Sequence, residues 1–111
     1  MRQSHTAIIE RNITWQGTFE TEPYEVAWAS EAIFFVRTLG AVGDVEEVTA
    51  RVQISPDGIR WCDEGTVVLL SGEIDGVTFG KVSHFGTFLR LVGDLTDGVT
   101  LTVIVALSLK E

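Results

Sequence analysis

Residues 48–61 read VTARVQISPDGIRW, and the pattern of this stretch decides the fold class. Over residues 48–54 apolar side chains alternate with polar ones, which is the period of a strand with one buried face. The alternation stops at Ser55 and resumes with Ile59 and Trp61. We therefore predict a β-hairpin in which Trp61 is buried on the returning strand.

The turn of this hairpin consists of Ser55, Pro56, Asp57 and Gly58. Ser55 can bond the backbone ahead of it, and Pro56 sets φ at the second position of the turn. Gly58 leaves the turn without the steric penalty of a Cβ atom, so the four residues match a type I turn. The stretch indicates a fold class and, on its chemistry alone, no function.

The rest of the chain consists of short apolar or alternating runs separated by turn residues. Besides the hairpin we expect strands within residues 7–15, 24–28, 32–36, 66–70, 77–82, 88–92 and 99–109. The first is either one strand or two that are broken near Asn12. The run 32–36 is apolar on both faces, so it lies in the centre of its sheet or meets another subunit. We expect the segments 40–44 and 62–65 to be a loop and a turn.

Turn signals recur at the spacing of roughly 8–12 residues that is typical of a sandwich or barrel. No stretch has a sustained helical period, a repeat or a linker. We predict one all-β domain over residues 1–111, an antiparallel β-sandwich of about eight to nine strands, jelly-roll or immunoglobulin-like in form. Strand order does not follow from a single sequence.

The charge of the chain excludes two classes of partner. Sixteen acidic residues against eight basic ones give a net charge of −8, which repels nucleic-acid phosphates and anionic membranes. The polar N-terminal residues do not resemble a secretory signal, and no apolar run approaches the ~20 residues that span a bilayer. We expect a soluble protein, cytoplasmic or virion-associated. Its single cysteine fits a reducing compartment or a bond between molecules.

The residues that could carry out catalysis do not form a known arrangement. Cys62 could in principle pair with His5 or His84, but its acidic neighbour Asp63 raises a thiol pKa instead of lowering it. One cysteine and two histidines are too few for a structural zinc site. No glycine-rich phosphate loop is present. We predict no catalytic residue, no metal, no cofactor and no enzyme activity.

Calcium remains an alternative, because carboxylates gather in several predicted loops. None of these groups has the spacing of an EF-hand, and aspartates before glycine, as at Asp75 and Asp97, suit turns for backbone reasons. A sugar-binding surface is a further alternative. Against it, Trp15, Trp28 and Trp61 all lie in apolar alternation, which favours the core.

Apolar residues that the monomer would leave on its surface point to self-association. On the last strand one face is apolar throughout, and the opposite face still carries Ile104 and Ala106. Phe34 and Phe35 place one ring on each side of their strand. We predict that these four residues belong to an interface between copies of the chain. The alternative is that both sheets are covered within the monomer.

Two resemblances follow from these patterns. The hairpin Val52–Trp61 resembles the S-x-DG-x-x-W signature of discoidin-type and other β-sandwich binding modules. The order of the whole chain is similar to small β-sandwich proteins of bacteriophage and prophage structural gene regions. That order runs from the strand with Asn12-Ile13-Thr14, through the hairpin, to Phe88-Leu89-Arg90-Leu91 and the hydroxyl-alternating last strand.

The second resemblance implies a non-enzymatic virion component, such as a head-decoration or tail-associated protein, that forms a symmetric oligomer, often a trimer. Its partners would be copies of itself and a capsid or tail protein, and it transfers no catalytic residue. The short N-terminus departs from the pattern, because it lacks a long arm for attachment to a capsid. The other hypothesis is a carbohydrate- or ligand-binding module of the discoidin type.

Overall fold

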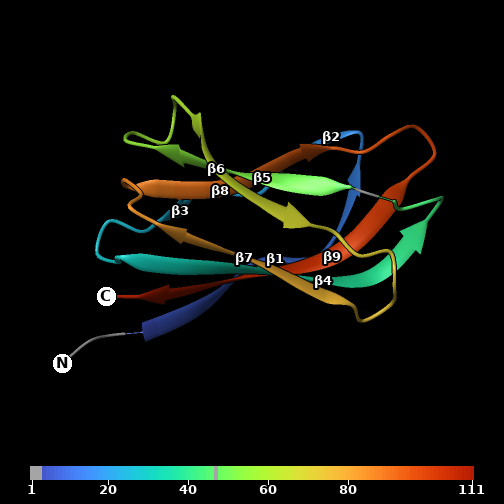
Figure 1. The fold of residues 1–111 in the computed structure, drawn as a ribbon, viewed down its shortest axis with the longest axis horizontal. Helices are drawn as coiled ribbons and strands as arrows, with labels where there is room; N and C mark the ends of the chain where they lie inside the picture. Colours follow the sequence, from blue (N-terminus) through green and yellow to red (C-terminus); the bar gives the residue numbers. More distant parts are fainter. Residues whose placement is uncertain (1–3, 47) are drawn as a thin grey trace.

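Two antiparallel β-sheets pack face to face in the computed structural model, which describes residues 4–46 and 48–111 (Figure 1). Nine strands are present in these ranges: β1 (Ser4–Gln16), β2 (Thr18–Glu20), β3 (Tyr24–Glu25), β4 (Glu31–Val42), β5 (Thr49–Ser55), β6 (Cys62–Leu69), β7 (Val77–Ser83), β8 (Phe88–Asp94) and β9 (Thr100–Lys110). The predicted antiparallel β-sandwich is confirmed. Across the described part of the chain, no helix has the length and apolar character needed to cross a membrane.

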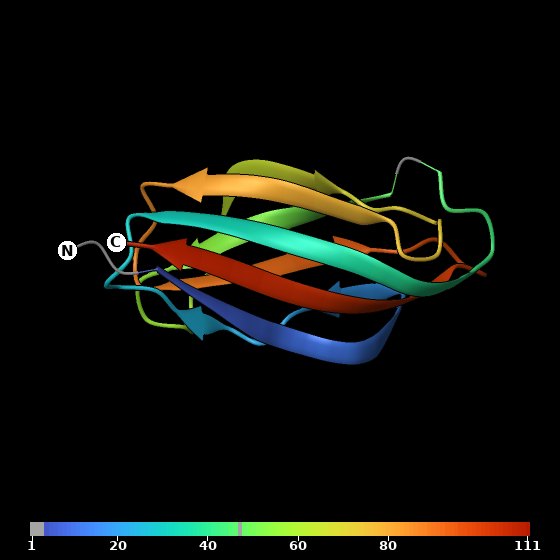
Figure 2. The same ribbon diagram turned by 90° about the horizontal axis from the view of Figure 1, so that it is seen from below.

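The strand order mixes the two halves of the chain. The four-stranded sheet has the order β1-β9-β4-β7, and the five-stranded sheet has the order β2-β8-β5-β6, with β3 also paired to β8. Figure 2 shows β1, β9, β4 and β7 side by side, with the start of β1 and the end of β9 at the same end of the sandwich. There Ser4 pairs with Lys110.

The core lies between the sheets and follows the predicted alternation most closely on β9. The inward side chains of β9, together with Val99 just before the strand, are all between 0 and 5% exposed: Val99, Leu101, Val103, Val105, Leu107 and Leu109. Strand β4 lies between β9 and β7, so the prediction that the apolar run is central in its sheet is confirmed. Phe34 on β4 pairs with Leu107 in this register, and both side chains are fully buried.

The predicted hairpin is present as the pair β5–β6, but its connection is longer than the sequence suggests. The hydroxyl of Ser55 accepts a hydrogen bond from the Gly58 amide at 2.8 Å. The carboxylate of Asp57 accepts hydrogen bonds from the amides of Ile59 and Arg60, each at 2.9 Å. These bonds hold residues 56–60 in a closed loop, so the strand does not resume at Ile59, which is 77% exposed.

Several further predictions were wrong because local hydrogen bonding or pairing overrides alternation. Trp61 lies ahead of β6 and is half-buried instead of a core residue. Trp28 is 39% exposed, because the chain turns after β3; only Trp15, 3% exposed and stacked on Phe19 at 4.0 Å, is in the core. The segment 62–65 belongs to β6, and β4 continues to Val42 by pairing with β9.

The first strand is one element with an internal irregularity. Its pairing with β9 shifts between Ile8 and Ile13, and Asn12 has a φ of 55°. Asparagine tolerates this left-handed conformation better than most residues. The break expected near Asn12 is therefore a bulge within β1, which bends the strand without ending it.

The turn aspartate gives a testable acid dependence. Hydrogen bonds from the backbone amides of Arg60 and Ile59 lower the pKa of exposed Asp57 from 3.8 to about 2. Because the folded pKa lies below the ordinary value, the stabilisation is complete above about pH 4 and is lost as the pH falls towards 2. We expect the excess thermal stability of wild type over Asp57→Asn to shrink across this range.

Thermal unfolding monitored by circular dichroism between about pH 2 and 5 measures this difference. Asp97→Asn, which removes a carboxylate from another exposed Asp-Gly turn, controls for the loss of one negative charge. A stability difference between wild type and Asp57→Asn that stays constant with pH would contradict the assignment.

Candidate functional site

The outer face of the four-stranded sheet carries a row of apolar side chains that crosses all four strands. The pairing places Ile8 beside Ala106, Ala106 beside Phe35, and Phe35 beside Phe79. The rings of Phe35 and Phe79 are 6.2 Å apart between centroids. Ile8 and Phe79, on the two edge strands, are 45% and 57% exposed. We refer to these four residues as the apolar row.

The cross-strand pairs on either side of the apolar row add further apolar residues, and polar or charged residues among them mark the edge of the apolar surface. On one side Ile104 pairs with Arg37, which pairs with Val77, a residue that is 56% exposed. On the other side Ser108 pairs with Ile33, which pairs with Lys81. The apolar row with Ile33, Val77 and Ile104 therefore forms one continuous surface, which we call the apolar face.

Charges of both signs stand around the apolar face and nearly balance. The register places Arg37, Lys81, Lys110 and Glu31 on this side of the sheet. The guanidinium of Arg37 pairs with Asp75 at 2.7 Å. In a chain of net charge −8, this side thus contributes little of the negative excess. Two copies can approach through it with less repulsion than through an acidic surface.

The predicted interface residues divide between the two faces of the sheet. Phe35, Ile104 and Ala106 lie together on the outer side, where each is half-buried. Phe34 points the other way and is fully buried in the core, so its prediction as a surface residue was wrong. Consecutive residues of a strand face opposite sides, and the core takes the ring at Phe34.

The sequence analysis missed Ile8, Ile33, Val77 and Phe79. Each lies in an expected strand, but the alternation of a single strand does not tell which of its two faces meets the other sheet. Phe79 alternates with the small Gly80, and this pattern favours a buried phenylalanine. The structure buries Gly80 instead: a Cβ on it would come within 2.6 Å of Val68. In the sequence, the only sign of which face of this strand is buried was the alternation of a large residue, Phe79, with a small one, Gly80.

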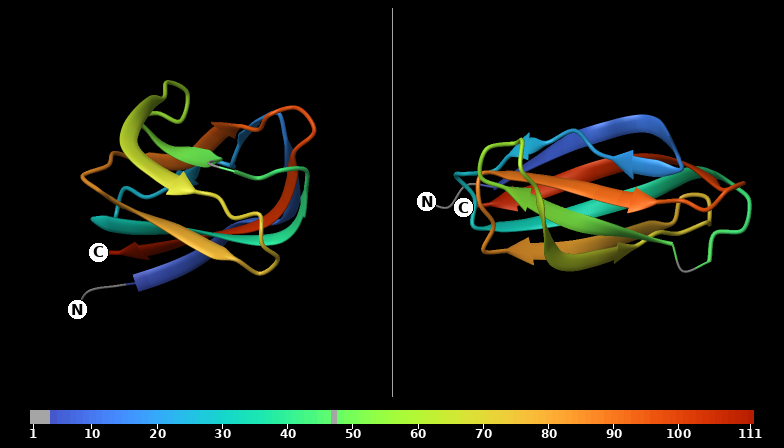
Figure 3. Two further views of the ribbon diagram at one scale, coloured as in Figure 1. Left: turned by 45° about the vertical axis from the view of Figure 1, so that its right-hand side comes forward. Right: turned by 90° about the horizontal axis from the view of Figure 1, so that it is seen from above.

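The outer face of the five-stranded sheet, which lies towards the viewer in the right-hand view of Figure 3, carries a group of hydrogen-bonded polar side chains beside the exposed Val67 and Leu69. Arg90 donates from Nε and Nη2 to Gln53 Oε1, at 3.0 and 2.8 Å, and from Nη1 to Glu20 at 2.9 Å. Gln53 Nε2 donates to Asp63 at 2.9 Å. The guanidinium of Arg90 also lies 4.1 Å from the ring centre of Trp61. We call these five residues the polar strip.

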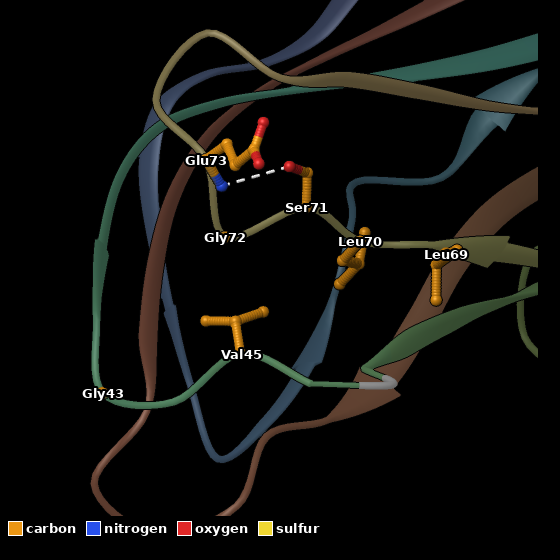
Figure 4. Close-up of a pocket in the computed structure, with 7 residues that line it drawn as sticks. All are labelled: Gly43, Val45, Leu69, Leu70, Ser71, Gly72 and Glu73. Carbon is orange, nitrogen blue, oxygen red and sulfur yellow. Dashed lines mark hydrogen bonds between the residues drawn. The ribbon is translucent and has the colours of Figure 1, made fainter.

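The segments around residues 43–45 and 69–73 lie at the end of the sandwich opposite the end of β9 (Figure 1). They line a pocket of about 450 Å³ (Figure 4). It is lined by Gly43, Val45, Leu69, Leu70, Ser71, Gly72 and Glu73. In Figure 4 Val45 points towards Gly72, and the Glu73 amide donates to the Ser71 hydroxyl at 3.1 Å. The lining residues include no histidine, lysine or arginine, so Ser71 has no basic partner there.

The structure shows no hydrogen bond between Cys62 and either histidine among the described residues. Cys62 is a free, exposed thiol at the start of β6, whereas His5 lies on β1 of the other sheet. His84, with a φ of 56°, follows β7. Within residues 4–46 and 48–111, no three histidine, cysteine or carboxylate side chains are grouped as a metal site would require.

Comparison with known proteins gives structural relatives only. No family model and no curated protein matches the chain. The chain is similar to the SPBc2 prophage-derived protein YomS, with a TM-score of 0.60, 9% identity, and coverage of 100% of this chain and 96% of that one.

Two further solved structures are similar at lower coverage. A chain in the structure of the infectious bursal disease virus Gx strain gives a TM-score of 0.54 at 14% identity, over 98% of this chain and 32% of that one. An F5/8 type C domain from Bacteroides fragilis gives 0.51 at 14% identity, over 85% and 74%. At these identities the similarities establish the β-sandwich fold and leave the function open.

Proposed function

We propose that the chain is a non-enzymatic structural protein that associates with copies of itself through the apolar face. We place it in a phage or prophage virion as a decoration or tail-associated component, with a capsid or tail protein as its further partner. The observation that carries this proposal is the apolar row, which crosses four strands and leaves Ile8 and Phe79 about half exposed.

The size of the face suits a stable contact. Strand β4 has 12 residues, about 40 Å at roughly 3.3 Å per residue, and four strands are about 19 Å wide. The sheet therefore offers on the order of 700 Å², close to the ~800 Å² per partner of a stable interface. Covering about 300 Å² of apolar surface would contribute several kcal/mol before the cost of association.

The position of the exposed groups favours a closed ring. Ile8 lies on one edge strand of the sheet, whereas Val77 and Phe79 lie on the other. A cyclic assembly, for which we prefer a trimer, can bring the β1 side of one subunit against the β7 side of the next. Because each chain carries a net charge of −8, screening by salt should strengthen the contact.

The assignment to a virion draws on the fold and on one relative. YomS is prophage-derived and matches this chain over nearly the full length of both proteins. The strand order, with β9 between β1 and β4 and with β8 between β2 and β5, favours the jelly-roll form of the sandwich. Jelly rolls occur in viral capsid proteins and also in lectins, so the fold is compatible with a second candidate function, ligand binding.

The self-association proposal predicts that one charge on the apolar face dissociates the oligomer. We expect wild type to sediment as a multiple of 12.2 kDa at about 50 µM and Ile104→Lys to sediment as a monomer, with at least a tenfold weaker association. Phe79→Lys should have the same effect without touching the centre of the sheet. Analytical ultracentrifugation in low and high salt measures both.

A lysine introduced outside the apolar face tests whether dissociation reflects the loss of a specific contact or only a general increase in solubility. Ile59→Lys changes an apolar residue that is 77% exposed on the β5–β6 loop, and we expect it to keep the wild-type mass. A wild type that sediments as a monomer at this concentration would reject the proposal. Dissociation by Ile59→Lys would reject the apolar face as the contact.

A further inference from the structure

The polar strip joins side chains from four neighbouring strands of one sheet. Glu20 on β2, Arg90 on β8, Gln53 on β5 and Asp63 on β6 provide one residue from each of four neighbouring strands. Hydrogen bonds of 2.8–3.0 Å join these side chains into one chain across the sheet. Long polar side chains on an outer face usually lose rotamer freedom only at a cost. In the polar strip, hydrogen bonds hold four such side chains to one another.

Arg90 is the centre of this arrangement. Its side chain is only 17% exposed, although it stands on an outer face of the sandwich. Three of its nitrogens donate to Gln53 and Glu20, and the guanidinium carbon lies over the Trp61 ring, 4.1 Å from its centre. The arginine thus fixes a carboxylate, an amide and an indole relative to one another, so a ligand would not have to order them.

Together with the neighbouring Arg51, the strip is neutral within an acidic protein. The cations at this place are Arg90 and Arg51, and the anions are Glu20 and Asp63, which are 63% and 55% exposed. Arg51 Nε lies 3.6 Å from Asp63. A charged ligand would therefore find no net attraction in the strip, and an anionic one would be repelled by the remaining surface of a chain with net charge −8.

We propose that the polar strip binds a neutral saccharide. The exposed carboxylate oxygens of Glu20 and Asp63 can accept hydrogen bonds from sugar hydroxyls, and Gln53 and Arg90 add an amide and further donors. The indole of Trp61 supplies an apolar surface beside them, which is the combination of aromatic and fixed polar groups found in small-molecule sites. The strip lies on the opposite side of the sandwich from the apolar face, so the two activities are independent.

The test uses three neutral hexasaccharides, of glucose, of mannose and of N-acetylglucosamine, with a sulfated hexasaccharide for comparison. Isothermal titration and the shift of the Trp61 indole N–H signal in NMR report binding. We expect at least one neutral hexasaccharide to bind, and Trp61→Ala to weaken it by at least about tenfold. Arg90→Lys should also weaken it, because lysine cannot hold Gln53 and Glu20 together or stack in the same way.

Trp28→Ala is the matched control, since Trp28 is the other tryptophan outside the core and lies on the segment between β3 and β4, which contributes no residue to the strip. It should leave the affinity unchanged, and thermal unfolding checks that each variant is folded. Binding that survives Trp61→Ala in a folded protein would overturn the proposal. So would tighter binding of the sulfated sugar, or no binding of any neutral hexasaccharide at millimolar concentration. The sedimentation of Trp61→Ala should match wild type, which separates this result from self-association.

Discussion

Phe34→Ala is expected to destabilise the protein by about 3–5 kcal/mol, as other truncations of large core residues do. The ring is fully buried on the central strand β4. In the register Phe34 lies between Leu107 on β9 and Gly80 on β7. Gly80 has no side chain that could move into the space, so the cavity should stay largely open. Urea unfolding followed by tryptophan fluorescence measures the loss.

Phe79→Ala is a matched control for this loss, because it removes the same ring from the neighbouring strand. Phe79 is 57% exposed, and its truncation should cost less than about 1.5 kcal/mol in dilute solution, where association does not contribute. Equal losses from the two variants would mean that the sheet does not have the orientation described here. The pair therefore tests which face of β4 and β7 meets the core.

Gly43→Ala is expected to cost about 2–4 kcal/mol, the second largest effect. Gly43 has a φ of 89°, a left-handed conformation that costs an alanine about 1–2 kcal/mol. A Cβ atom at this position would also collide with the backbone carbonyl of Gly98. Backbone cannot rotate away as a side chain can, so the loops that contain these glycines must separate. Thermal and urea unfolding both report the change.

Gly17→Ala separates the cost of the positive φ from the cost of the contact with Gly98. Gly17 also has a positive φ, of 64°, but nothing lies within 4 Å of a Cβ built on it. Its substitution should therefore show the conformational cost alone, about 1–2 kcal/mol. A loss at Gly43 no larger than the loss at Gly17 would show that the contact with Gly98 relaxes freely.

Most of the fold could be predicted from the sequence, because the alternation of apolar and polar residues is a local property of each strand. The buried face of β9 and the central place of β4 follow from the residues of those strands alone. Trp61 was misplaced because the side chains of Ser55 and Asp57 bond to the loop backbone and delay the next strand. The alternation of apolar and polar residues does not reveal where side-chain hydrogen bonds to the backbone will interrupt a strand.

The candidate sites were less predictable, because both depend on pairing between distant strands. Ile104 and Ala106 were identified as surface residues, but nothing in the sequence places Ile8 beside Ala106 or Phe79 in the same row. The polar strip depends even more on pairing. Glu20 and Arg90 are 70 positions apart, and Gln53 and Arg90 are 37 apart. Only the strand order brings them into contact.

The central position of β9 also determines how the chain can reach its native state. Both β1 and β4 pair with β9, the final strand in the chain order. The four-stranded sheet therefore cannot close until that strand is available, and β1 and β9 must meet across almost the whole chain. Contacts of such separation make folding slow, typically in milliseconds to seconds. Until then the apolar strand β4 has no neighbour on that side, so a nascent chain is most prone to aggregate just before β9 emerges.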